Sequence, residues 1–362
     1  GVTLGDNGGG TGSTNTNGNN YVGWFWNAGD TDGKTYTVTV VSDSGNKYRF
    51  DGFGTSAVTL DLAEGGTYIF NYPSAHPFRF STTSDGTHGG GTEYTTGVTV
   101  LSSTSVQIVV AASAPALYYY CSSHSGMGGA INTNSTLGSS NFDGSIQTTA
   151  KVNANAGFSI ATYTGNNASA TIGHGLGVAP NAVIIKRRNG TGDWIIGHDG
   201  LASDAFANNK FLKFTASSTF TNSLVFGSQP TSSVVQIVTG SGATNLNGSS
   251  DTYIAYCFSE VAGYSKFGSY VGNGSTDGTF VFCGFRPAWV LLKKTNASDN
   301  WTIFDNKRDI NNPMHHRIVA QSNGSENTTL SNSQDQIDFL SNGFKLKSTS
   351  NNHNGNNSSN IF

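Results

Sequence analysis

The stretch Leu117-Tyr-Tyr-Tyr-Cys121-Ser-Ser-His124-Ser-Gly-Met127 decides how the first third of the chain is interpreted. Its apolar and aromatic beginning is typical of a strand, and the polar loop that follows carries a thiol, an imidazole and a thioether. A second imidazole lies upstream, in Pro73-Ser-Ala-His76-Pro-Phe-Arg-Phe80. Two imidazoles, one thiolate and a weak axial thioether form the ligand set of a blue-copper site. The candidate metal ligands are therefore His76, Cys121, His124 and Met127.

The same residues have a second interpretation. Buried free cysteine and methionine behave as ordinary hydrophobic side chains, so this cluster could also belong to a sandwich core that holds no metal. The sequence leaves both interpretations open.

At these residues the chain resembles the cupredoxins. The segment Tyr118–Ile131 is similar to a shortened plastocyanin ligand loop, and its Cys-x2-His-x2-Met spacing is that of the amicyanin variant. The segment Leu60–Pro73 looks like the strand–turn–strand that leads to the first histidine in that family. The resemblance covers roughly residues 34 to 134 and implies a Greek-key β-sandwich with a mononuclear type 1 copper site.

Composition predicts an all-β chain. Only 11% of the 362 residues are charged and 47 are glycine. Short runs of Val, Ile, Thr, Tyr and Phe are bounded by Gly, Asn, Asp and Ser, which is typical of many short strands and turns. No stretch long enough for a helix carries a helical stripe. The length suits about two or three domains.

Charge and hydropathy exclude two classes of partner. The formal net charge is −3, and the densest basic clusters, Lys186-Arg187-Arg188 and Lys293-Lys294, end apolar strands, so no footprint for nucleic acid is expected. No segment reaches the roughly 18 apolar residues of a membrane span. Three cysteines are too few for a disulfide framework, and we expect Cys257 and Cys283 to be buried small hydrophobes.

An internal repeat organises the rest of the chain. Tyr163–Pro180 aligns without a gap on Tyr270–Pro287, and Ala182–Lys186 falls on Trp289–Lys293, at a constant offset of 107 residues. A separation of this size equals one domain, so we expect two tandem β-sandwich repeats. Each would contain a hairpin of the form Val-Ile-Ile-Lys, polar turn, Trp-x-Ile.

The expected organisation has five parts. They are a Gly/Asn-rich flexible arm with an aromatic anchor (1–33), a cupredoxin-like domain (34–134), a polar linker (135–153), β-sandwich repeat one (154–262) and repeat two (263–362). The aromatic cluster Tyr21–Trp26 is interpreted as an anchoring strand packed on the sandwich, or alternatively as a contact to a neighbouring subunit.

Both ends of the sequence suggest further chain. Gly1 is not a natural start, so we expect an upstream part. Repeat two stops at Ser359-Asn-Ile-Phe362, about where repeat one closes with Ser250–Tyr256. We expect either a sequence cut short there or a last strand that another chain completes, because an unfinished edge strand is a template for pairing.

Other candidates for chemistry are weak, and we do not expect an enzyme. His198 and Asp199 are neighbours on a predicted strand, where adjacent side chains point to opposite faces. Nucleophile-elbow, Walker and His-Glu-x-x-His motifs are absent from the sequence. His315 and His316 follow Met314, but a third ligand cannot be identified from the sequence, so a solvated loop is expected there.

The repeats resemble a β-sandwich domain of fibre and other virion proteins of marine tailed phages, particularly phages of cyanobacteria and of abundant ocean bacteria. The segments that carry this resemblance are Gly268–Gly278, Gly284–Lys293 and Asp338–Leu346, within about residues 152 to 362. Repeat one departs from the pattern, with Val178-Ala179-Pro180 in place of Phe-Arg-Pro. The Cys121–Gly129 loop also looks like cupredoxin-like modules embedded in such virion proteins.

This second resemblance implies a structural or adhesive role at the virion surface, outside the cell. The implied partners are other virion subunits, further copies of the chain in a homo-oligomer, and a glycan or protein receptor on the host. Two alternatives stay open: a secreted copper protein that transfers electrons, and a subunit of a bacterial extracellular filament or adhesin.

Overall fold

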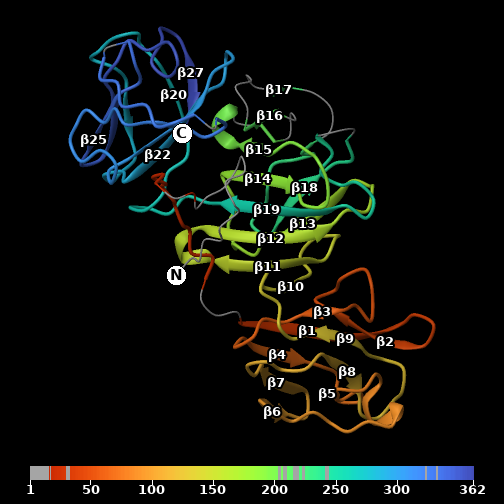
Figure 1. Cartoon of the computed structure of the whole chain (residues 1–362). Coiled ribbons are helices and arrows are strands. Elements are labelled where there is room, and N and C mark those ends of the chain that lie inside the picture. Colours follow the sequence, from red (N-terminus) through yellow and green to blue (C-terminus); the bar gives the residue numbers. More distant parts are fainter. Residues whose placement is uncertain are drawn as a thin grey trace.

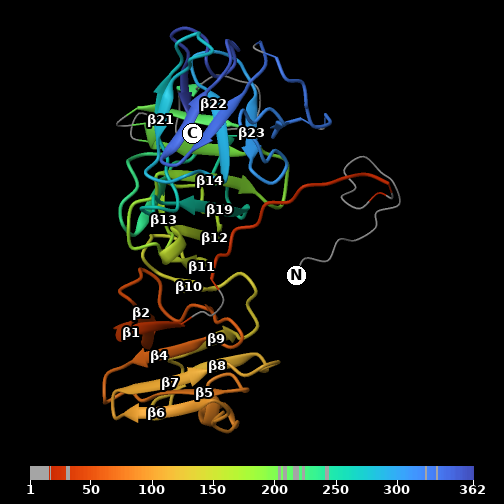
Figure 2. The same ribbon diagram turned by 90° about the vertical axis from the view of Figure 1, so that its left-hand side faces the viewer.

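The computed structural model describes residues 16, 18–29, 33–202, 205–206, 210–214, 220–221, 225–240, 244–322, 324–331 and 333–362, and it confirms an all-β chain. Three β units follow one another in a column (Figures 1 and 2). We call them the first unit (residues 33–132), the second unit (139–258) and the third unit (269–361). In the described part of the chain, no helix is long and apolar enough to cross a membrane.

The first unit consists of two packed sheets. The five-stranded sheet has the order β2-β1-β4-β7-β6, with β1 (Gly33–Ser42), β2 (Asn46–Phe50), β4 (Thr67–Asn71), β6 (Val98–Ser102) and β7 (Ser105–Val109). The four-stranded sheet has the order β3-β9-β8-β5, with β3 (Leu60–Asp61), β5 (Phe78–Ser81), β8 (Leu117–Cys121) and β9 (Gly129–Asn132). The pairs β1–β4 and β3–β9 are parallel, and the other neighbours are antiparallel.

An aromatic core joins these two sheets. Along β4 the side chains alternate, with Tyr68 and Phe70 buried, Ile69 half-buried and the two end residues exposed, as expected of a strand with one face in a core. Phe70 stacks on Phe78 of the opposite sheet at a centroid distance of 4.7 Å, and Phe78 stacks on Tyr119 at 5.3 Å. This packing makes the first unit a β-sandwich. The 3-10 turn η1 (Gly86–Gly89) lies beside it.

The second unit is built on an eight-stranded sheet of order β10-β11-β12-β19-β14-β15-β16-β17. Its strands are β10 (Ser139–Asn141), β11 (Thr148–Asn153), β12 (Phe158–Thr164), β14 (Ala182–Arg187), β15 (Ile195–His198), β16 (Lys210–Lys213), β17 (Phe220–Thr221) and β19 (Thr252–Phe258). A two-stranded sheet pairs β13 (Ala170–Gly173) with β18 (Val234–Ile237). Two 3-10 turns, η2 (Ala154–Ala156) and η3 (Asp199–Leu201), complete it.

The structure differs from the predicted polar linker 135–153, because three of its residues form strand β10 and six form strand β11 of this sheet. Ser140 is fully buried, and its carbonyl accepts a hydrogen bond of 2.8 Å from the Tyr36 hydroxyl of the first unit. Phe142 packs in the aromatic core of the first unit. The polar groups of this segment form hydrogen bonds with the first unit. The two units therefore share a specific interface.

The third unit has a five-stranded sheet of order β20-β27-β22-β23-β24 and a three-stranded sheet of order β21-β26-β25. The strands are β20 (Ser269–Val271), β21 (Phe280–Phe282), β22 (Trp289–Lys294), β23 (Trp301–Asp305), β24 (Ile318–Val319), β25 (Ile337–Leu340), β26 (Gly343–Leu346) and β27 (Ser359–Ile361). Strand β27 lies between β20 and β22, as β19 lies between β12 and β14. The larger sheet thus repeats the order β12-β19-β14-β15-β16 of the second unit.

A small apolar cluster joins the second and third units. It contains Ile196 and Leu212 from the second unit and Trp301 and Ile361 from the third. The Trp301 indole nitrogen donates a hydrogen bond of 2.8 Å to the carbonyl of Lys213.

The described part of the N-terminal arm differs from its prediction, since residues 18–29 form no strand. Trp26 makes edge-to-face contacts with Phe258 of the second unit and Trp289 of the third, at centroid distances of 6.4 and 5.5 Å. Trp24 donates to the Asp305 carboxylate at 3.2 Å. The arm, red in Figure 2, therefore runs along the upper two units. Residues 1–15, 17 and 30–32 of the predicted arm lie outside the described residues.

Candidate metal centre

Strand pairing brings the predicted ligands of the first unit together. Strands β5 and β8 are antiparallel neighbours, with Phe78 opposite Cys121. His76 lies two residues before Phe78, in the turn after β4, so the register places it beside the end of β8. A hydrogen bond of 3.1 Å from the Ser122 amide to the Pro77 carbonyl extends this pairing into the ligand loop.

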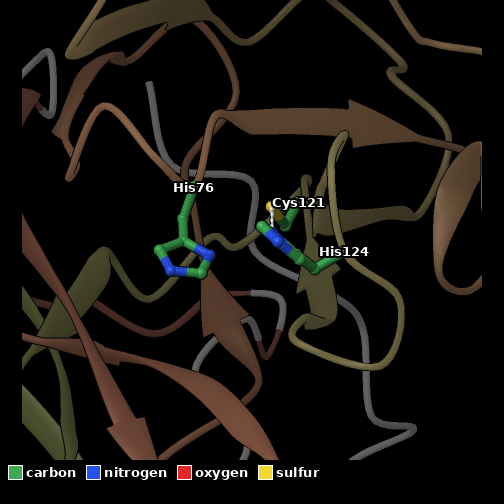
Figure 3. A group of neighbouring side chains, drawn as sticks. All are labelled: His76, Cys121 and His124. Atoms are coloured by element: carbon green, nitrogen blue, oxygen red, sulfur yellow. Dashed lines mark hydrogen bonds between the residues drawn. The ribbon is translucent and has the colours of Figure 1, made fainter.

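The three side chains in Figure 3 point toward one another. The Cys121 sulfur lies 3.6 Å from Nδ1 of His124, and the rings of His76 and His124 have centroids 4.6 Å apart. One donor atom from each of the three residues lies within 4.8 Å of the other two. Cys121 is fully buried, His76 is half-buried and His124 is exposed, so the group opens to solvent through the His124 edge.

His76 is held by its backbone, which leaves its ring nitrogen available. Its amide donates to the Pro73 carbonyl at 2.8 Å, and its carbonyl accepts from the Tyr48 hydroxyl at 2.8 Å. The ring Nδ1 atom is buried and has no hydrogen-bond partner among the described residues. Leaving a buried polar atom unsatisfied costs about 1–3 kcal/mol. A metal ion would remove that cost.

The ligand loop is tied down on both sides. The Gly126 amide donates to Asp85 at 2.8 Å, and the Gly126 carbonyl accepts from the Lys47 ammonium. The Met127 carbonyl accepts from the Tyr48 amide at 3.0 Å. A Cβ at Gly128 would lie 1.7 Å from the Tyr119 carbonyl oxygen, so only glycine allows this close return of the chain to β8.

Met127 and Cys121 are both fully buried members of the aromatic core. The site therefore has an apolar inner wall, and Met127 is the residue whose thioether would serve as the weak ligand of such a site. Burial, with a further contribution from Cys121, raises the pKa of the Tyr48 phenol far above its ordinary value. Tyr48 thus stays a neutral hydrogen-bond donor beside the thiol.

The donor set fits copper. A thiolate with two imidazoles suits soft and borderline ions such as copper or zinc, and the unsatisfied His76 nitrogen and the fixed loop supply a cradle for one. Bound copper would supply one-electron redox chemistry. A core that packs the same residues without metal accounts for the burial of Cys121 and Met127 but leaves the His76 nitrogen without a partner.

The other residues considered from the sequence, Cys257, Cys283, His198 and Asp199, do not form a reactive site. Cys257 and Cys283 are free, buried thiols, as predicted. Burial raises their pKa to about 12 and about 11 respectively, so both stay protonated and unreactive.

His198 and Asp199 do come within 3.6 Å, contrary to the prediction from strand geometry, because the strand ends there and η3 begins. Burial lowers the pKa of His198. Its ring contacts the Gly200 amide and the Phe362 carbonyl at 3.0 and 3.2 Å. These backbone contacts explain the position of the His198 ring as part of the structure.

Comparison with known families identifies part of the chain. Residues 131–362 match a domain of unknown function, DUF7483, and because the match covers more than half of the chain, the protein belongs to this family. The match begins before β10, in agreement with the finding that residues 139–153 belong to the second unit. The chain matches no curated protein and no solved structure.

Proposed function

We propose that this chain is a phage virion structural protein, a component of a tail fibre or of a surface-displayed fibre, that acts in host attachment or virion assembly. The observation that carries the proposal is the column of three β units, in which neighbouring units are joined by hydrogen bonds and apolar contacts. A fibre must transmit force without bending at each linker, and here the units contact one another directly beside the short connecting segments 133–138 and 259–268. The resemblance of the repeats to virion proteins of marine tailed phages points the same way.

The joint between the first and second units is polar and specific. The Gln147 side chain donates to the Thr59 carbonyl at 2.8 Å and to the Ser140 hydroxyl at 3.0 Å. The Thr149 hydroxyl donates to the Asp61 carboxylate. Together with the buried Tyr36–Ser140 hydrogen bond, these contacts fix the orientation of the two units. This rigidity favours a structural role.

A cleft at the same joint offers a place for a receptor. It has a volume of about 580 Å³ and is lined by six threonines together with Phe53, Asp61, Asn132, Gln147 and Arg188, among others. Hydroxyl, amide and charged groups beside an aromatic ring are the contacts that a glycan uses. The cleft supports a carbohydrate receptor over an apolar one.

Immunogold labelling tests the proposal. Antibodies against the purified chain are applied to lysates of the source culture and examined by electron microscopy. The proposal expects gold on tails, fibres or surfaces of phage particles. Labelling confined to filaments on bacterial cells would replace it with the adhesin alternative, and labelling of soluble material only would contradict both.

A second candidate function is electron transfer by a secreted copper protein, and the unsatisfied Nδ1 atom of His76 favours it. The test is cyclic voltammetry of the chain loaded with Cu(II). A reversible one-electron wave that Cys121→Ser removes would support this candidate. Bound copper without such a wave would leave the metal a stabilising role in the ligand loop and would contradict electron transfer.

A further inference from the structure

A second group of metal-binding side chains lies in the third unit, far along the column from the first. The connection from β23 to β24 brings together Asp309, His315 and His316, with one donor atom of each within 4.8 Å of the other two. We propose that this group binds a divalent first-row transition ion, with Zn²⁺ as its representative. Two imidazoles and a carboxylate suit such ions.

Asp309 organises the cluster. Its carboxylate is 9% exposed, and Oδ2 accepts hydrogen bonds from the amides of His315 and His316 at 2.7 and 3.1 Å. These two bonds place the carboxylate against both histidines. Among the described residues nothing hydrogen-bonds its second oxygen, Oδ1, which stays available as a ligand.

The two imidazoles face the same space. Nδ1 of His315 lies 3.0 Å from Oδ2 of Asp309, and the rings of His315 and His316 are 4.6 Å apart at 74°. Neither ring nitrogen of His316 has a hydrogen-bond partner within the described ranges. Both rings are half-buried, so an ion can reach them from solvent.

The spacing is close to what an ion requires. Ligand atoms around a tetrahedral zinc ion lie roughly 3.3 Å apart, given bonds of about 2.0–2.1 Å. Nδ1 of His315 and Oδ2 of Asp309 are already near that separation, and one donor atom of each of the three residues lies within 4.8 Å of the other two. Nδ1 of His315 also lies 3.2 Å from the Pro313 carbonyl oxygen, a contact that an ion bound to this atom would replace.

The backbone around the histidines is anchored. Met314 is fully buried in the core of the third unit and exchanges two backbone hydrogen bonds with Ile337, at 2.7 and 3.1 Å. Arg317 makes a similar exchange with Asn327, at 3.0 Å in both directions. His315 and His316 thus lie between two fixed residues, which pre-positions a site. The corresponding part of repeat one, residues 199–213, contains no histidine, so the site is particular to the third unit.

Zinc titration of the full chain tests the proposal. Cys121→Ser removes the thiolate of the first centre and serves as the parent. After chelator treatment, isothermal titration calorimetry with ZnCl₂ at pH 7.5 is expected to give one Zn²⁺ per chain, with affinity at least tenfold weaker in Asp309→Asn, His315→Ala and His316→Ala. Co²⁺ added to the parent should give a visible d–d spectrum that His316→Ala loses.

The controls separate binding from folding. Asp309→Asn keeps an oxygen acceptor for the two amides, and Ile310→Ala changes a neighbour that is 75% exposed and should bind zinc like the parent. Circular dichroism checks that each variant is folded. Zinc binding that is absent from the folded parent, or that survives unchanged in both histidine variants, would overturn the proposal.

Discussion

Trp301 provides a quantitative test of the joint between the second and third units. Its side chain is 3% exposed, contacts the Phe214 ring at 5.0 Å and donates to the Lys213 carbonyl at 2.8 Å. Replacing a buried aromatic residue by alanine costs about 3–5 kcal/mol. Trp301→Phe keeps most of the ring but loses the hydrogen bond, for about 1–2 kcal/mol. Both substitutions should weaken the contact between the second and third units.

The repeat supplies a matched control. Trp194 occupies the equivalent position of the second unit at the 107-residue offset, but it is 41% exposed. Trp194→Ala should therefore cost about 1 kcal/mol or less.

Urea unfolding, followed by circular dichroism and intrinsic fluorescence, measures the difference. We expect Trp301→Ala to lower the midpoint and to separate the unfolding of the second and third units into two transitions. Trp194→Ala should keep the parent's profile. Equal costs at the two positions, or an unsplit transition in Trp301→Ala with the parent's midpoint, would refute the reasoning.

Three further predictions concern other parts of the chain. Gly128→Ala should destabilise the first unit by about 2 kcal/mol or more, because its Cβ meets the Tyr119 carbonyl; a thermal melt unchanged from the parent would contradict this. Trp24→Ala removes the contact with Asp305 and the cation–π contact with Arg308, so limited proteolysis should cut the arm faster, while Phe25→Ala, at a ring 74% exposed, should not change the rate. Burial lowers the pKa of His174, His198 and His353, so the unfolded chain binds more protons than the folded chain below about pH 6.5. The free energy of unfolding should therefore fall as the pH drops below that value, by up to about 1.4 kcal/mol per pH unit for each histidine. His353→Gln should reduce this pH dependence when urea unfolding is compared at pH 7.5 and pH 5.

The sequence predicted the features that depend on local pattern. Strands β14 and β22 coincide with the apolar runs that the repeat alignment matched, because a short continuous apolar run indicates a buried strand without tertiary information. The proximity of His76 to Cys121 could be expected from the ligand spacing, and the β5–β8 register accounts for it. The assignment to a phage virion has no test in the fold and stays a proposal.

The features that the sequence did not predict depend on contacts between distant segments. Residues 139–153 are polar enough to suggest a linker, yet Ser140 is buried because its partners come from the first unit. The third ligand of the His315–His316 pair, Asp309, lies in an irregular connection with no periodicity to reveal it. His198 and Asp199 meet because the strand stops between them, and a strand boundary is the least certain part of a sequence-based assignment.

The proposal that can be tested most directly is that the first unit holds a copper ion with His76, Cys121, His124 and Met127. The most direct test is metal content with a visible spectrum, recorded on the purified full chain after addition of Cu(II) and removal of excess ion. We predict one copper per chain bound in the first unit, with an intense blue thiolate-to-copper band that Cys121→Ser abolishes. A colourless parent that keeps no copper in this unit would contradict the proposal and leave Cys121 and Met127 as ordinary members of the hydrophobic core.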